Sequence, residues 1–418
     1  MSATPVTTGR ASAPVVGAPA PVPARRRSAP SSVRRLRGLQ LGAVALILAF
    51  GAFAITALAL SLTAASHASQ SLTQYYRLAD AQVQALQVQQ SANTWALTPT
   101  SAVRQQLDQR LGTLATTLAD AAAVSDDRDR VVPLTGALVS YAMTLQDALN
   151  ANGTDSAAIA AKADNQLTDD LITPLQAATA HAGDRVATDL TGNWKFWVLG
   201  GAVLAGAGLA AIGVALARAS HRYLNIGLAA GLLCALVSAG VVWTVAGQAG
   251  TAASDFAGTS RAVLDNLTTA RQSIHQARAD ELLSVGLQSA GGTYADRWST
   301  GYNAAKNALA DVPKSGTASN ALLAYGTGHS TVANAIGKSQ WAQAASAAVG
   351  SSAKAATSFD DLDTKLTALA TSTRQPVTSS VTTLGTGVAG AIAGVIVFTL
   401  AGAGLTFWGV SRRIEEYR

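Results

Sequence analysis

Four stretches of the chain consist almost entirely of apolar and small residues. They cover residues 39–63, 194–217, 223–246 and 384–408, each about 24 residues long. At 1.5 Å per residue, a helix of this length extends roughly 36 Å and crosses a hydrocarbon core of about 30 Å. None of the four has an ionisable side chain in its interior, and none shows the polar face of a soluble helix. We therefore predict four transmembrane helices, the second and third forming a hairpin.

Positive charge is concentrated in short stretches beside these segments. The hairpin loop, residues 218–222, contains Arg218 and Arg222, and the end of the chain contains Arg412 and Arg413. Short loops rich in Lys and Arg stay on the cytoplasmic side of a membrane. This pattern predicts a multi-pass protein of the cytoplasmic membrane with both termini in the cytoplasm.

The first 38 residues have seven arginines, no acidic residue and no helical period. We expect residues 1–38 to form a disordered basic tail that lies on anionic lipid, which is favoured over a nucleic-acid-binding arm. The apolar run that follows is longer than that of a signal peptide, so it is expected to remain as an uncleaved span. Residues 409–418 are expected to form a second cytoplasmic tail.

The segment 64–193 has the pattern of four helices. Apolar or small residues recur at steps of three and four from Leu72 to Leu97, which continues the first span as a helix. Pro99 ends this helix because proline has no backbone N–H to donate, and Pro174 is expected to kink the last one. The expected helices cover about residues 65–97, 101–124, 127–151 and 154–190. Short turns between them predict an up-down-up-down four-helix bundle outside the membrane.

The segment 247–383 repeats this layout. Its helices are expected at about 247–290, 293–310, 318–336 and 340–383, with Ser339 capping the last and Pro376 kinking it. The fold class is therefore an all-α membrane protein, with four transmembrane helices and two extracytoplasmic four-helix bundles. Because both halves enter from and return to the cytoplasm, they are expected to be tandem parallel repeats.

No catalytic or cofactor motif is present. The chain lacks a phosphate-binding Gly-rich loop, a His-Glu-x-x-His motif, paired cysteines and a Gly-x-Ser-x-Gly motif. We expect no enzyme activity, no cofactor and no metal, and His67 and His181 are interpreted as solvated side chains. The spans lack the buried charges of ion pathways, which disfavours a transporter. The pairs Ala202/Gly206 and Gly390/Gly394 have the spacing that lets helices pack closely.

Two sets of charged residues are candidates for contacts. Asp126, Asp127 and Asp129 are expected at the membrane-distal end of the first bundle, where a periplasmic partner could dock, although capping and solvation are the favoured interpretation. The arginines of the hairpin loop and of the C-terminal tail are the candidate contacts for a cytoplasmic partner. In the second half, Arg278 is expected to pair with Glu281 on one helix face, which contributes only a few tenths of a kcal/mol.

Short motifs accompany the layout. Residues 277–281 (Ala-Arg-Ala-Asp-Glu) follow the third span, residues 78–81 (Leu-Ala-Asp-Ala) follow the first, and residues 222–225 (Arg-Tyr-Leu-Asn) open the third. In these motifs and over residues 34–418, the chain resembles the GlnX family of four-span membrane proteins of high-GC Gram-positive bacteria. Arg278, Asp280 and Glu281 are the residues that carry the family-like motif.

The resemblance implies chemoreceptor-like sensor bundles that relay an amino-acid signal of the aspartate or glutamate type. The signal would pass from a glutamine-binding lipoprotein outside to the soluble protein kinase G inside. The sequence therefore predicts a transmembrane sensor, surrounded by lipid, with a homodimer as an open alternative and no nucleic-acid partner. A different class, a structural or accessory subunit of a transport or cell-envelope assembly, is the second hypothesis.

Overall fold

The computed structural model describes residues 30–151, 153–190, most of 200–215, Arg218, 226–350 and 353–416. These residues are almost entirely helical, and none of them forms a strand. Half of the expected second span and most of the hairpin loop, with Arg222, lie outside the described residues, as does the tail before Pro30.

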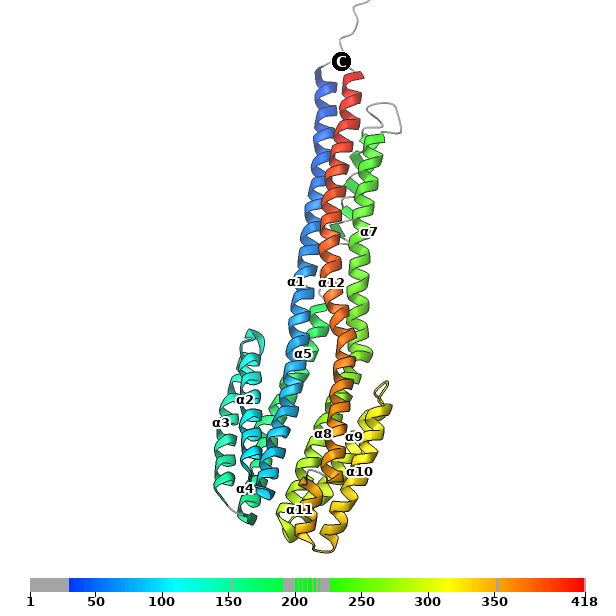
Figure 1. Cartoon of the computed structure of the whole chain (residues 1–418). Helices are drawn as coiled ribbons and strands as arrows, with labels where there is room; N and C mark the ends of the chain where they lie inside the picture. Colours follow the sequence, from blue (N-terminus) through cyan, green and yellow to red (C-terminus); the bar gives the residue numbers. More distant parts are fainter. Residues whose placement is uncertain are drawn as a thin grey trace, which may run out of the picture.

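Three long helical runs organise the molecule. Helix α1 covers Pro30–Leu97 and α12 covers Lys354–Glu416. Helix α7, Ile226–Asp255, continues through the π-helical turn η3, Phe256–Ser260, into α8, Arg261–Gly286. All three runs are long and apolar enough to cross a membrane, as predicted for the first, third and fourth apolar segments. Figure 1 shows α1, α12 and α7 side by side along one end of the molecule.

The N-terminal helix group consists of residues 64–97 of α1 with α2 to α5. Its elements are α2 Ser101–Ala122, η1 Ser125–Asp127, α3 Arg128–Asn150, α4 Gly153–Gln166, η2 Leu167–Ile172 and α5 Thr173–Leu190. Buried leucines on α1 to α3, such as Leu72, Leu114 and Leu138, form its core. The turn η2 is π-helical and ends at Ile172, two residues before Pro174. A widened turn relieves the clash between the proline ring and the preceding carbonyls, so the irregularity lies where the kink was expected.

The C-terminal helix group consists of α8 to α11 with residues 354–383 of α12. Its further elements are η4 Gln288–Ala290, α9 Gly292–Ala310, α10 Gly316–Gly337 and α11 Trp341–Val349. The expected continuous helix from residue 340 is interrupted, because α11 ends at Val349 and α12 begins at Lys354. The expected cap at Ser339 is wrong, since Ser339 has a left-handed φ of 56° and Gln340 occupies the N-cap without a side-chain bond.

The apolar parts of α7 and α12 pack closely, although at residues other than those expected. A Cβ on Gly227 would lie 2.6 Å from the Leu405 carbonyl oxygen and 2.7 Å from the Gly409 Cα. By contrast, a Cβ on Gly390 or Gly394 would meet no atom within 4 Å. The small-residue spacing that matters is therefore Gly227/Gly231, four residues apart, which the sequence also contains.

Candidate functional site: a polar joint between the two helix groups

Residues 64–97 of α1 lie between the other helices of the N-terminal helix group and the C-terminal helix group, and glutamines of α1 bond to α2, α4 and α5. The Nε2 of Gln74 donates to the Ala121 carbonyl at 2.9 Å, and that of Gln89 donates to the Ala160 carbonyl at 3.0 Å. Between them, Gln82 donates to the Leu175 carbonyl and the Thr179 hydroxyl. These glutamines recur at steps of eight and seven and therefore share one helix face. Their bonds satisfy buried amides, which fixes the rotation of α1 against α2, α4 and α5.

The opposite side of α1 carries an ionic cluster that joins three helices. The Asp80 carboxylate lies 2.9 Å from Arg271 Nη1 of α8, and 2.7 and 2.8 Å from Arg374 Nη1 and Nη2 of α12. Burial raises the pKa of Asp80, but the hydrogen bonds and charges of the two arginines outweigh it and hold the pKa below its usual value. The Arg374 guanidinium also lies 4.8 Å from the ring centre of Tyr76. Asp80 therefore ties α1 to both long runs of the C-terminal half.

Further polar contacts extend this joint in both directions along α8. Closer to the apolar stretch, the Tyr75 hydroxyl donates to Asp265 at 2.5 Å, and Arg261 lies 2.6 Å from Asp184 of α5. Burial and the Asp265 charge raise the pKa of Tyr75. Towards the other end, His275 contacts Asp363 of α12 and Gln90 of α1. The joint thus continues over several turns instead of resting on one ion pair.

At the far end of the joint, two buried aspartates from different groups share their partners. Asp164 of α4 and Asp280 of α8 lie 2.8 and 3.2 Å from Arg297 Nη2. The Nε2 of Gln276 also donates to both carboxylates, at 3.2 and 3.3 Å. Burial raises the pKa of Asp280 to about 7, although the Arg297 charge lowers it and the Asp164 charge raises it further. This arrangement connects α4, α8 and α9.

Glu281 is the centre of a second buried cluster, inside the C-terminal helix group. It pairs with Arg278, accepts from the Tyr325 hydroxyl at 3.2 Å and lies 2.7 Å from Nδ1 of His329. The Trp298 ring stacks on His329 with centroids 3.4 Å apart. Burial raises the pKa of Glu281, but Arg278 and His329 outweigh it and hold the pKa below its usual value.

The expected pairing of Arg278 with Glu281 is confirmed, but its setting differs from the one predicted. Arg278 is 4% exposed and Glu281 is fully buried, so the pair is part of a core and not of a solvated helix face. Removing one partner of such a pair costs about 3–5 kcal/mol instead of a few tenths. Asp280, the third residue of the family-like motif, contacts Arg297 of α9 in its own helix group, and Arg297 also contacts Asp164 of the N-terminal helix group.

The acidic candidates of the first half lie elsewhere than expected. Asp127 is fully buried, pairs with Arg185 and lies 3.3 Å from His181. Arg185 is near the end of α5, so η1 lies at the end of the N-terminal helix group nearest the apolar segments and not at the distal end. The expectation failed because α2 runs back along α1 from the tip at Leu97. The Asp127 carboxylate therefore has a structural role.

The remaining candidates are not brought together in the described part of the chain. Asp126 is exposed and lies 3.3 Å from Arg185, and Asp129 is exposed in the first turn of α3. The Arg412 guanidinium lies 5.0 Å from the Trp408 ring centre. Arg218 is helical, and the side chain of Arg413 is not among those that the structure describes. Among the described residues, no group of three or more His, Cys, Asp or Glu could hold a metal ion.

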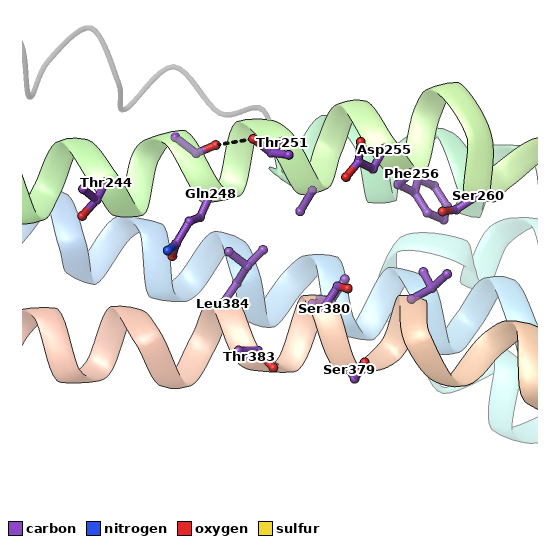
Figure 2. Close-up of a pocket in the computed structure, with 14 residues that line it drawn as sticks. Thr244, Gln248, Thr251, Asp255, Phe256, Ser260, Ser379, Ser380, Thr383 and Leu384 are labelled. Atoms are coloured by element: carbon purple, nitrogen blue, oxygen red, sulfur yellow. Dashed lines mark hydrogen bonds between the residues drawn. The ribbon is translucent and has the colours of Figure 1, made fainter.

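A groove of about 780 Å³ opens between α7–η3 and α12, just beyond their apolar stretches. Figure 2 shows Gln248 and Thr251 on one wall and Thr383 and Leu384 on the other. Serine, threonine and glutamine side chains line it together with one carboxylate, Asp255, and with the apolar residues Ala252, Phe256, Val377, Val381 and Leu384. The described residues of the groove offer hydrogen bonds but no cation that would neutralise the carboxylate of a free amino acid.

The residues that build the joint were mostly missed from the sequence. Arg271, His275 and Arg278 recur at steps of four and three along α8, and all three are buried. Charged residues on a buried face are expected to be paired, and this signal was available. Their partners on α1, α4 and α12 could not be read from spacing.

No protein family, curated protein or solved structure was found to match the chain.

Proposed function

We propose that this chain is a transmembrane signal-relay protein of the cytoplasmic membrane. In this proposal four helices span the membrane, the two helix groups are extracytoplasmic four-helix bundles in tandem parallel arrangement, and both termini are cytoplasmic. The observation that carries the proposal is the Asp80–Arg271–Arg374 cluster. It ties together three helical runs, each of which continues into an apolar segment.

The mechanism follows from the continuity of these runs. Asp80 and Arg374 lie roughly 15–25 Å beyond the apolar segments at helical rise. A ligand or partner that shifts one helix group moves α1 relative to α8 and α12 at this cluster. Because helices transmit small axial or rotational shifts over their length, the shift reaches the cytoplasmic ends. The packed interface around this cluster is the element whose two arrangements such a relay requires.

The partners in the proposal come from the family resemblance. A solute-binding lipoprotein would report aspartate or glutamate to the helix groups, and a protein kinase would contact the arginines of the hairpin loop or the C-terminal tail. The groove between α7 and α12 has no cation for a ligand carboxylate among its described lining residues, which favours sensing through the binding protein over direct binding of the amino acid.

Topology is tested by cysteine labelling in whole cells of a Cys234→Ala variant. A cysteine at the exposed position Thr116 should react with a membrane-impermeant maleimide. A cysteine at Arg412 should react only after permeabilisation. Labelling of both positions, or of neither, in intact cells would refute the proposed orientation.

Relay is tested in cells that contain the kinase. Phosphorylation of the kinase substrates is measured after addition of glutamate or aspartate, for the native chain, for Asp80→Asn and for the exposed control Asp311→Asn. We expect Asp80→Asn to reduce the response several-fold at unchanged membrane abundance, and the control to leave it intact. Equal responses in all three would overturn the relay. Stable co-purification with a permease and no kinase effect on deletion would instead support the accessory-subunit hypothesis.

A further inference from the structure

Asp164 and Asp280 form a buried carboxylate pair across the joint between the two helix groups. Asp164 is fully buried and Asp280 is 1% exposed. Both contact Nη2 of Arg297 and Nε2 of Gln276, so the two carboxylates are held by the same two donors. A pair of like charges this close in a dry interior is disfavoured when both are ionised.

The charges around the pair do not balance. Arg297 is the single cation in contact with the two carboxylates among the described residues, and its guanidinium lies over the Tyr294 ring at 5.0 Å. The phenols Tyr141 and Tyr294 also lie near Asp164, and burial and the Asp164 charge raise the pKa of both, so neither supplies a positive charge. Two ionised aspartates would therefore leave one uncompensated negative charge at this interface.

One oxygen of the pair has no donor among the described residues to stabilise a negative charge. Oδ2 of Asp280 is buried and has no hydrogen-bond partner in the described part of the chain. An ionised oxygen without a donor is far more costly to bury than a neutral hydroxyl. The raised pKa of Asp280, about 7, agrees with this geometry and has burial as its main cause.

We propose that Asp164 and Asp280 form a proton-binding site, in which a single proton on Asp280 holds the two helix groups together. The proton comes from solvent through the side of Arg297, which is 34% exposed, and returns there when it is released. Its release leaves two carboxylates facing one guanidinium, and the resulting repulsion separates α4 from α8 and α9. The ligand of this site is the proton itself, and its action does not depend on the relay partners.

The direction of the pH dependence follows from the raised pKa. The folded protein binds the proton up to about pH 7, whereas the unfolded chain releases it near the usual value of 3.8. The stabilisation is therefore fully present at low pH and is lost as the pH rises through about 7. The two helix groups are therefore held together below about pH 7 and separate above it.

The proton is detected by infrared titration of the full chain in nanodiscs. The carbonyl stretch of a buried protonated carboxyl should be present at pH 5.5 and lost by pH 8.5. It should be absent in Asp280→Asn and retained in the exposed control Asp311→Asn. A titrating band that is identical in all three proteins, or no such band in the native chain, would overturn the proton site.

The structural consequence is measured by spin-label distances in the Cys234→Ala background. Labels at the exposed positions Ala158 of α4 and Asn303 of α9 report the joint. In the native chain the distance distribution should broaden and lengthen from pH 5.5 to 8.5. Asp280→Asn, which copies the neutral form, should keep the short distance at both pH values, and Asp311→Asn should behave as native.

Two outcomes overturn the structural consequence. One is a native distance that does not change with pH, and the other is an Asp280→Asn distance that changes as the native one does. If Asp280→Asn does not fold, Asp164→Asn replaces it, because it removes the repulsion from the other side of the pair and should likewise abolish the pH dependence. If the spin-label distance of the native chain changes with pH but kinase signalling does not respond to this protein, the relay is refuted and the proton site stands.

Discussion

Replacing Asp80 with asparagine tests whether the ionic cluster holds the long helices together. The native carboxylate accepts three short hydrogen bonds from two guanidinium groups. An asparagine of the same shape has one acceptor oxygen, and its NH2 group faces a donor. At least one of Arg271 and Arg374 therefore loses its partner while it stays largely buried.

The size of the effect follows from the exposure of the cluster. Removing one partner of a fully buried ion pair costs about 3–5 kcal/mol, whereas an exposed pair contributes about 0–1 kcal/mol. The Asp80 side chain is 33% exposed, and those of Arg271 and Arg374 are 11% and 21% exposed. We therefore expect a loss of about 2–3 kcal/mol, which corresponds to a roughly 30- to 150-fold rise in local opening.

Hydrogen exchange measured by mass spectrometry in nanodiscs gives this opening directly. Exchange should rise in residues 75–90 of α1 and 367–380 of α12, while α2 and α3 keep their protection. The matched control is Asp361→Asn, whose partner Lys365 is 3.1 Å away at an exposed site. The control should change exchange by less than about fivefold.

A double-mutant cycle separates the ion pair from general damage. Asp80→Asn combined with Arg374→Gln should cost much less than the sum of the two single changes, because the unpaired buried charge is gone. A change of less than about threefold in both segments, or an equal rise across the whole chain, would refute the assignment of the cluster as the link between α1 and α12.

Three further predictions concern the rest of the structure. Glu281→Gln should lower the stability of the C-terminal helix group by about 3–5 kcal/mol. The pKa of the Glu281 carboxyl lies below its usual 4.5, so the stability that this carboxyl contributes should be present above pH 4.5 and lost as the pH falls below it. Acid unfolding followed by circular dichroism checks this pH dependence. Gly227→Ala should weaken disulfide crosslinking between cysteines introduced into α7 and α12 in membranes. Gly394→Ala should leave this crosslinking unchanged, since a Cβ added at Gly394 has space. Arg185→Gln should leave the buried Asp127 carboxylate short of a cation and reduce thermal stability, and an unchanged melting temperature would contradict its structural role.

The helical layout was largely predictable from local pattern. Apolar runs, proline positions and the three-four period indicate where helices begin and end, because these depend on backbone hydrogen bonds and on the side chains of near neighbours. The helix α2 begins at Ser101, as expected, and α9 ends at Ala310. The break between α11 and α12 was missed, because Gly350 is the single helix-breaking residue near it and one glycine does not by itself end a helix.

The polar joint was outside the reach of the sequence. Burial on two sides of α1 depends on how two helix groups dock, which spacing along one helix does not reveal. The tertiary structure pairs Asp80 with Arg374 from the far end of the chain and places Asp164 against Asp280. The sequence alone determined an all-helical chain with long apolar segments, since that follows from periodicity and length. Only the tertiary structure decided which charges are buried and paired, because desolvation and pairing arise when distant segments meet.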